Sequence, residues 1–393
     1  MQTVILAAGK GIRVQPLSLT RPKPLLGFLG KSVLEHNLDQ LVGLVKEVIL
    51  VVGYKGEKIK EFFGRKYKNL KITYVFQKKQ IGTGDAAKKA LPYIKDKFLL
   101  LNGDDFYEKA DIKNCLKKLP SILVKKVKNS SSFGQILIKK NIVKGLVEKP
   151  KKPVSKMVNT GLYFLDKSVF NFKIKKSERG EYEFTDYLKA FMKKRKLYWK
   201  LAKDWFPVPC LWNLLDVNEY LLGKIRKSLK KGKIEKNCRL SGKVIIEKGT
   251  LIKSGSYIAG PVYIGKNSII GPNCFIRGST SIGENCRIGQ AVEIKNSIIG
   301  DNSKICHLSY VGDSIIGSNC NLGAGTIVAN LRHDKKTVKT MINGKLKDTG
   351  RKNFGTILGD NVKTGIGTLI YPGRKIWPGK FTLPGQIVKK DII

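Results

Sequence analysis

Large aliphatic residues recur at every sixth position through the central part of the chain. These positions are Ile234, Leu240, Ile246, Ile252, Ile258, Ile264, Ile270, Ile276, Ile282, Ile288 and Ile294. Four places after each comes a mostly small residue, at Cys238, Val244, Thr250, Ser256, Val262, Ser268, Cys274, Thr280, Cys286 and Val292. Neither a helix nor a simple strand has a period of six. The pattern predicts a triangular prism of short strands whose coils stack in parallel, about 4.8 Å apart.

The repeat continues to the end of the chain with two changes of phase and one interruption. The phase slips by one residue at Ile299 and again at Ile316, and it holds as far as Val328. A polar insertion follows, and the repeat resumes at Leu358 and continues to Val388. A hexapeptide β-helix is therefore expected over residues 234–393.

The first half of the chain has a different pattern, in which buried strands alternate with helical spacing. Strands are expected at residues 4–6, 48–52, 72–76 and 98–101, and helices at residues 34–46, 57–66 and 86–91. This alternation is typical of an α/β fold with a doubly wound, mostly parallel sheet. We expect a nucleotide-binding type of domain over residues 1–217, a helical and basic linker over 218–233, and the β-helix after it. A helix over residues 216–229 would close the first domain.

Composition adds limits on location and partners. The hydrophobic fraction of 42% is ordinary for a globular protein, and no apolar run approaches the length of a membrane span. The N-terminus enters a strand without a basic leader, which favours a cytoplasmic protein that does not associate with membranes. The seven cysteines form no C-x-x-C pair, and several occupy small inward positions of the prism, so we expect reduced, structural thiols.

The formal net charge of +45 is unusual. The lysines are scattered through every segment, and no recognised nucleic-acid motif accompanies them. This distribution favours a general lysine bias, with attraction of anionic ligands as a by-product, over specific nucleic-acid binding.

A glycine-rich segment follows the first strand. Two glycines straight after a buried strand let backbone N–H groups approach a phosphate, and a nearby arginine and lysine neutralise its charge. The whole string LAAGKGIRVQPLSLTRPKPLL, which starts at Leu6, resembles the signature of sugar-1-phosphate nucleotidylyltransferases. The resemblance implies that Arg13 and Lys23 are catalytic and flank the triphosphate of UTP or dTTP. It also implies nucleotide contacts from Ala7, Ala8, Gly9, Gly11, Gln77, Gly82 and Thr83.

Further segments carry the same resemblance. Asp104 follows a central strand and matches the Gly-Asp ligand of Mg²⁺, a metal that prefers carboxylate and phosphate oxygens. Gly134, Glu148 and Asn159 match residues that hold the sugar phosphate. One departure stands out. Relatives carry W-x-D-I-G where this chain has Trp205-Phe206-Pro207-Val208-Pro209, so Pro207 occupies the position of the second metal ligand, and Asp204 would replace it only after a shift.

A second candidate site interrupts the β-helix pattern at HLSYVGD, residues 307–313, followed by NLGAGT, residues 321–326. These segments resemble the acetyltransferase domain of the bifunctional glucosamine-1-phosphate acetyltransferase/N-acetylglucosamine-1-phosphate uridylyltransferase family. The resemblance implies a left-handed β-helix, a homotrimer, and acetyl-CoA bound between neighbouring prisms. His307 would be the catalytic base, and Ala324 would contact acetyl-CoA. The predicted acceptor contacts are Arg277, Lys295, Tyr310, Asn321, Asn330 and Lys336.

The leading hypothesis is an enzyme that N-acetylates an amino-sugar 1-phosphate and then couples the product to UTP. Pro207 favours an alternative in which the nucleotidyltransferase half is impaired and only acetyl transfer occurs. A nucleotidyltransferase with the β-helix as a mere scaffold is opposed by His307, Arg277 and Lys295. A non-enzymatic assembly subunit is opposed by the intact phosphate-binding segment and Asp104.

Overall fold

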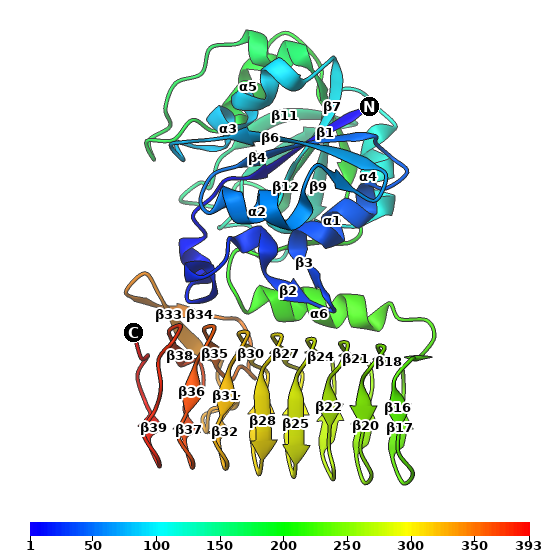
Figure 1. Cartoon of the computed structure of the whole chain (residues 1–393). Coiled ribbons are helices and arrows are strands. Elements are labelled where there is room, and N and C mark those ends of the chain that lie inside the picture. The colour runs from blue at the N-terminus through cyan, green and yellow to red at the C-terminus, as the bar shows by residue number, and fades with distance from the viewer. The chain divides into compact units, whose positions relative to one another are not determined.

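The computed structural model describes all 393 residues, and they group into two compact units (Figure 1). The first unit comprises Met1–Lys10, Pro22–Leu25 and Val33–Pro207. The second comprises Gly11–Arg21, Leu26–Ser32 and Val208–Ile393. The glycine-rich signature segment is thus divided between the two units.

The first unit is built on a ten-stranded mixed sheet with the order β10-β11-β13-β9-β12-β7-β1-β4-β6-β5. The strands are β1 (Gln2–Ala7), β4 (Glu47–Val52), β5 (Lys66–Tyr67), β6 (Leu70–Phe76), β7 (Lys97–Asn102), β9 (Ser121–Lys126), β10 (Gln135–Lys139), β11 (Ile142–Val147), β12 (Met157–Asp166) and β13 (Tyr198–Leu201). At the centre, β7, β1, β4 and β6 are parallel, while β12 runs antiparallel to β7 and β9. The expected α/β class is confirmed.

Helices cover both faces of this sheet because successive strand residues point to opposite sides. In β1, Val4 packs in the cluster with α3 (Thr83–Ala90) and α5 (Phe184–Met192). Its neighbour Ile5 packs in the opposite cluster, with helices on the other face (Figure 1). Those helices are α1 (Val33–Leu41), α2 (Gly56–Phe63) and α4 (Lys109–Leu116).

Three short antiparallel ribbons accompany the sheets. In the first unit, β8 (Asp105–Tyr107) pairs with β14 (Trp205–Pro207), and Pro207 lies opposite Asp105. The second unit contains β2 (Gly27–Phe28) with β3 (Lys31–Ser32), and β33 (Lys339–Ile342) with β34 (Lys345–Asp348).

The second unit is a parallel β-helix whose strands form three sheets (Figure 1). The first sheet contains β15 (Leu229–Lys230), β18 (Val244–Ile246), β21 (Val262–Ile264), β24 (Thr280–Ile282), β27 (Ile298–Ile299), β30 (Ile315–Ile316), β35 (Ile357–Leu358) and β38 (Lys375–Ile376). The next contains β16 (Lys233–Ile234), β19 (Leu251–Ile252), β22 (Ile269–Ile270), β25 (Arg287–Gln290), β28 (Lys304–His307), β31 (Asn321–Leu322) and β36 (Lys363–Thr364). The third contains β17 (Arg239–Ser241), β20 (Tyr257–Ala259), β23 (Phe275–Arg277), β26 (Glu293–Lys295), β29 (Tyr310–Gly312), β32 (Ile327–Val328), β37 (Leu369–Ile370) and β39 (Ile387–Val388).

Strand register confirms the period read from the sequence. Ile246 pairs with Ile264 and Ile264 with Ile282, so these coils are eighteen residues long. Ile282 then pairs with Ile299 and Ile299 with Ile316, which makes two coils of seventeen residues at the phase slips. The large aliphatic residues form the buried core of the prism, and the polar insertion contains the ribbon of β33 and β34.

The junction with the β-helix differs in detail from the expected linker. Helix α6 runs over Asn213–Gly223, earlier than the helix expected at residues 216–229. Strands β15 and β16 already occupy part of the segment expected as a linker, because Leu229 pairs with Ile245 and Lys233 with Leu251. Sheet pairing outweighs local helical spacing here. No helix in the structure combines the length and apolarity needed to cross a bilayer.

Candidate active sites

The first unit collects most residues of the predicted nucleotidyltransferase site at one edge of its sheet. Parallel strands β1, β6 and β7 all end there, since Leu6 pairs with Asn102, Ala7 with Val52, and Val52 with Phe76. Ala7, Ala8 and Gly9 end or follow β1, Gln77 follows β6, and Asp104 follows β7. The carboxyl ends of strands are where open α/β sheets bind ligands. Open space lies beside Gly9, because an added Cβ would have no atom within 4 Å.

Lys23 and Asp104 form an ion pair at this edge. Lys23 is only 7% exposed, and its ammonium donates to Asp104 Oδ2. The Asp104 side chain is 38% exposed, so it still faces solvent. A buried cation beside a partly exposed carboxylate suits a site that receives both phosphates and a divalent ion.

The predicted base-reading residues are also fixed by local contacts. Gln77 is buried, and its Nε2 donates to Gly82 O at 3.1 Å and to Asp85 Oδ2 at 2.8 Å. Gly82 has a φ of +121°, and a Cβ there would lie 2.3 Å from the carbonyl oxygen of Tyr182, so only glycine fits. Thr83 Oγ1 accepts the backbone N–H of Phe184 at 3.0 Å.

The three predicted sugar-binding residues lie together. The backbone N–H of Asn159 donates to Gly134 O at 2.8 Å. A Cβ on Gly134 would approach Glu148 Oε2 to 2.8 Å, so a larger residue here would have to displace this carboxylate. Burial raises the pKa of Glu148, partly opposed by the charge of Lys149. This carboxylate is thus poorly solvated and available to accept hydrogen bonds from hydroxyl groups.

Gly11 and Arg13 belong to the second unit, in the segment Gly11–Arg21. Asp360, at a corner of the β-helix, fixes the end of this segment. Its Oδ2 accepts from Thr20 Oγ1 at 2.6 Å and from Arg21 at 2.7 Å, and Arg21 also donates to Ser318 Oγ at 3.0 Å. No motif or spacing in the chain predicted these contacts.

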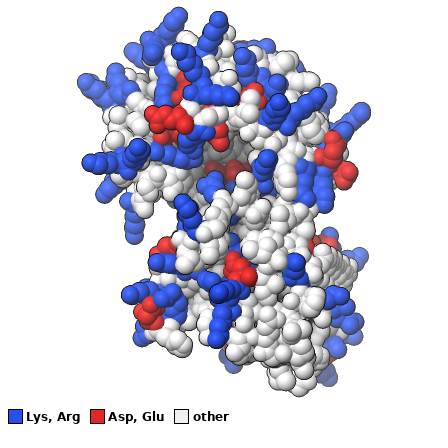
Figure 2. Space-filling view, turned by 90° about the vertical axis from the view of Figure 1, so that its left-hand side faces the viewer, with Lys and Arg blue, Asp and Glu red and all other residues white.

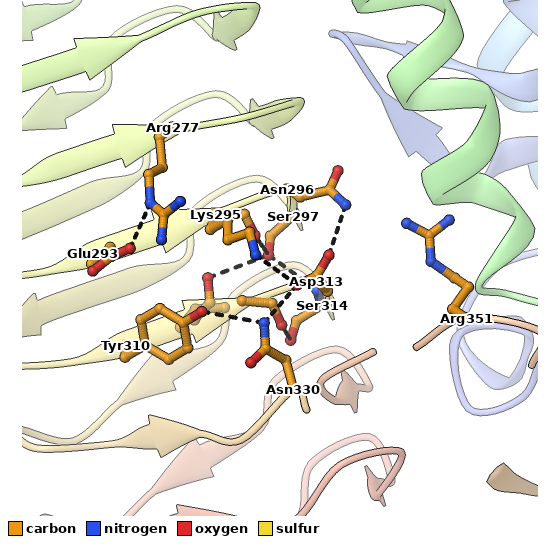
Figure 3. Close-up of polar contacts among 12 residues, drawn as sticks. Arg277, Glu293, Lys295, Asn296, Ser297, Tyr310, Asp313, Ser314, Asn330 and Arg351 are labelled. Carbon is orange, nitrogen blue, oxygen red and sulfur yellow. Dashed lines mark hydrogen bonds and ion pairs between the residues drawn. The ribbon is translucent and has the colours of Figure 1, made fainter. Parts of the chain in front are cut away.

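Four of the predicted acceptor residues lie on the third sheet of the β-helix and its continuation (Figure 3). Arg277 pairs in register with Lys295, and its Nε donates to Glu293 at 2.7 Å. Asn330 Nδ2 lies 3.2 Å from the Tyr310 hydroxyl. Burial raises the pKa of Tyr310, and the carboxylates of Glu293 and Asp313 raise it further, so the phenol stays protonated at neutral pH.

His307 ends β28 and is exposed, with its carbonyl fixed by two donors. Ser309 Oγ donates to this carbonyl at 2.7 Å and Gly325 N at 3.2 Å, which holds the turn beside Ala324. Asn321 and Lys336 are exposed on β31 and in the insertion, and no contact of their side chains with the Tyr310–Asn330 pair is present. One chain thus brings Arg277, Lys295, Tyr310 and Asn330 together and leaves the others on neighbouring surfaces.

Comparisons with known proteins identify relatives of both halves of the chain. The nucleotidyl transferase family matches residues 2–222, and the GMPPB C-terminal domain family matches residues 258–393. Bifunctional protein GlmU of Methanocaldococcus jannaschii is 43% identical over 100% of this chain and 96% of its own length. A protein of Sulfurisphaera tokodaii named bifunctional sugar-1-phosphate nucleotidylyltransferase/acetyltransferase is 40% identical, over 100% of this chain and 98% of its own. The chain belongs to this bifunctional family.

A solved structure supports the fold of the first domain alone. It is a putative glucose-1-phosphate thymidylyltransferase of Bacillus anthracis in complex with sucrose, 23% identical, with a TM-score of 0.52. It covers 56% of this chain and 95% of its own.

The second metal ligand expected from the sequence falls at Pro207, which has no carboxylate. Asp204 does not compensate, because Trp205 pairs with Tyr107 and Pro207 with Asp105, which puts Asp204 at the opposite end of the ribbon. Asp216 does not compensate either, since it binds Arg351 and Asn213. No group of three His, Cys, Asp or Glu side chains is arranged to hold a metal ion. If Asp104 binds Mg²⁺ as expected, nucleotide oxygens and water would complete the coordination.

The structure also reveals site residues that the sequence prediction missed. Asp313 is 3% exposed and lies at the centre of the acceptor residues (Figure 3). Because Asp313 belongs to the HLSYVGD segment, that motif could have identified it as a candidate site residue. Asn296, Glu219 and Arg351 also contact this group or its neighbours, but they come from distant segments with no shared pattern.

Proposed function

We propose that this enzyme N-acetylates glucosamine 1-phosphate, or galactosamine 1-phosphate, with acetyl-CoA, and transfers UMP from UTP, or dTMP from dTTP, to the sugar 1-phosphate. The products would be UDP-N-acetylglucosamine, or its counterpart, and pyrophosphate. The observation that carries the acetyl-transfer half is the cluster of Arg277, Lys295, Tyr310 and Asn330 (Figure 3). The exposed His307 lies on the same β-helix. The cluster supplies cations for a phosphate and hydrogen-bonding groups for a sugar, and His307 supplies a general base.

In the acetyl-transfer step, the neutral amine of the sugar attacks the thioester carbonyl and forms a C–N bond. His307 takes the proton that the nitrogen loses, the C–S bond breaks, and the proton passes to the departing thiolate of CoA. A histidine suits this task because its reference pKa lies close to neutral pH. Arg277 and Lys295 bind the phosphate and hold the amine in position.

In the nucleotidyl-transfer step, a phosphate oxygen of the sugar phosphate attacks the α-phosphorus of the nucleotide, and pyrophosphate leaves. Arg13 and Lys23 stabilise the charge on the phosphates, and Gln77, Gly82 and Thr83 select the base. Gly134, Glu148 and Asn159 hold the sugar. Mg²⁺, bound by Asp104, would supply further charge neutralisation at the phosphates. Since Pro207 provides no second carboxylate, we expect this half to need more Mg²⁺ than a site with two.

A homotrimer is part of this proposal. Tyr310, Ile327, Leu369 and Ile387 occupy one column of the third sheet, where each pairs with the next. Ile327, Leu369 and Ile387 are 39–47% exposed. A continuous exposed apolar column is typical of an interface. A neighbouring copy of the β-helix could cover it and complete the acetyl-CoA groove.

The high net charge does not change the proposal. Lysine and arginine side chains are spread over the face in Figure 2, with acidic side chains among them, and they do not form one patch. We propose that they attract anionic substrates and do not specify a nucleic-acid site.

The two halves are tested separately by measuring CoA thiol and pyrophosphate. His307→Ala should lower kcat for thiol release by about 10²–10⁴. Pyrophosphate release from UTP and N-acetylglucosamine 1-phosphate should stay unchanged. His333→Ala, an exposed histidine of the insertion, is the matched control and should retain both activities. Unchanged thiol release in His307→Ala would exclude His307 as the base.

A further inference from the structure

Asp313 joins three of the predicted acceptor residues. Its Oδ2 accepts from Asn330 Nδ2 at 2.6 Å and lies 3.8 Å from the Lys295 ammonium, while Asn330 also reaches the Tyr310 hydroxyl (Figure 3). The approach is tight, because a Cβ on the preceding Gly312 would lie 2.5 Å from the Tyr310 hydroxyl oxygen. The positions of Lys295 and Asn330 therefore depend on the position of this carboxylate.

Asn296 holds the other side of Asp313. Its Nδ2 donates to Asp313 Oδ1 at 2.8 Å and to Glu219 Oε1 of α6 at 2.9 Å. The two carboxylates fix the orientation of the amide, since its oxygen could not face both of them. That oxygen is buried and has no hydrogen-bond partner. The side-chain amide of Asn296 is thus held by the two carboxylates, while its backbone N–H donates to Arg277 O at 3.2 Å.

Arg351, at the end of the insertion, binds the same Glu219 oxygen. Its NH2 group lies 2.6 Å from Glu219 Oε1, and its NH1 group binds Asp216 on the same helix. Burial lowers the pKa of Arg351, but hydrogen bonding to Glu219 and the charges of Asp216, Glu219 and Asp313 raise it overall. Arg351 is thus the cation that pairs with Asp216 and Glu219 behind the acceptor residues, and its charge also acts on Asp313.

We propose that Arg351 is a positioning residue for the acetyl acceptor, acting through Glu219 and Asn296 on Asp313. Without it, Glu219 and Asp216 lose their countercharge, Asn296 loses one fixed partner, and Asp313 no longer holds Lys295 and Asn330 in one arrangement. The effect falls on binding of the amino-sugar phosphate and not on attack at the thioester. This inference rests on the proposed acetyl transfer.

The test compares Arg351→Met with Lys266→Met in the full-length enzyme. Lys266 pairs with Glu284 on the same β-helix, at 3.3 Å, outside the acceptor group, so Lys266→Met is the matched control. Arg351→Met should raise the KM for glucosamine 1-phosphate about tenfold, as expected when the lost charged hydrogen bond acts on the bound substrate indirectly, through other residues. The KM for acetyl-CoA, kcat for thiol release and pyrophosphate release should change less than about twofold. Arg351→Lys should recover part of the loss.

A double variant distinguishes positioning from general stability. If both residues act along one line of contacts, Arg351→Met with Asn296→Ala should raise the acceptor KM no more than the larger single change does. The positioning role would be overturned if the double variant raised the acceptor KM by the product of the two single effects, or if Arg351→Met left the acceptor KM unchanged. A parallel change in both KM values and kcat, together with a lower Tm, would also overturn it. Absence of thiol release in the unaltered enzyme with either amino sugar would instead overturn the proposed function.

Discussion

A lysine near the C-terminal end of the β-helix is almost completely buried. Lys375 is 2% exposed, and its ammonium lies 3.5 Å from the carbonyl oxygen of Gln15 and also donates to that of Met341. Burial lowers the pKa of Lys375 to about 8, although the charge of Asp391 opposes this shift. The folded protein therefore releases this proton more readily than the unfolded chain does.

This shift predicts a specific dependence of stability on pH. Between pH 8 and 10.5 the unfolded chain keeps the proton that folded Lys375 has lost, so the contribution of this group to stability rises with pH. The free energy of unfolding of the unaltered protein, minus that of Lys375→Met, should increase by about 3 kcal/mol across this window. Denaturant unfolding at several pH values measures it. Lys363→Met, at an exposed strand position, should give a flat difference, and a flat or falling difference for Lys375→Met would contradict the prediction.

Single residues of the sites were predictable only where a local motif marks them. Lys23 with Asp104 and Tyr310 with Asn330 do lie together, as the family motifs suggested. Arg351 was not predictable, because its partners lie more than 130 residues away and one arginine in a basic insertion has no distinguishing pattern.

At the scale of elements, the ribbon of β8 and β14 contains the position that we expect to set the metal requirement. Pro207 lies opposite Asp105, the residue that follows Asp104, and it occupies the position at which we expected a second carboxylate. Mg²⁺ tolerates one carboxylate with water and phosphate oxygens, but it then binds less tightly.

Restoring the carboxylate should therefore ease the metal requirement. In Pro207→Asp, the Mg²⁺ concentration that gives half-maximal pyrophosphate release should fall about tenfold, because a second ligand joins Asp104. Pro207→Asn has a similar shape without the charge and is the matched control. A Mg²⁺ titration of both variants gives the answer, and equal behaviour of the two would show that charge at this position does not bind the metal.

Regular elements were the most predictable part of the fold. The six-residue period predicted the strands of the prism, because side-chain size at inward positions is a strictly local requirement. The two phase slips seen in the sequence coincide with the seventeen-residue coils. Helix α6 was less predictable, because Leu229 has spacing that also suits a helix but pairs with Ile245 in a strand. Contacts of short segments such as Gly11–Arg21 with the β-helix were not predictable, because they produce no periodic pattern in the sequence.

At the scale of the whole molecule, the β-helix contacts a segment predicted to serve the other reaction. Asp360 binds Thr20 and Arg21, a few residues after Arg13, the predicted triphosphate ligand. The anchoring carboxylate is 4% exposed, so its hydrogen bonds are poorly replaced by water.

Weakening this anchor should affect nucleotidyl transfer and spare acetyl transfer. Asp360→Asn should raise the KM for UTP about five- to tenfold, because the segment carrying Arg13 loses a charged partner. Asp301→Asn is the matched control, since Asp301 accepts the N–H of Glu284 at 2.8 Å as Asp360 accepts that of Ser318 at 2.8 Å. Pyrophosphate and thiol release should be measured on both variants. An unchanged KM for UTP, or equal losses of both activities, would contradict this role.

The division of the signature segment between the two units has a consequence for recombination. The chain passes from one unit to the other after residues 10, 21, 25, 32 and 207, so five crossings connect them. A gene cut once, near codon 207, would yield a first fragment that carries Gly11–Arg21 without Asp360. Exchange of whole domains with other transferases would therefore need matching changes at Thr20, Arg21 and Asp360. We therefore expect the two halves to be inherited together, as one gene.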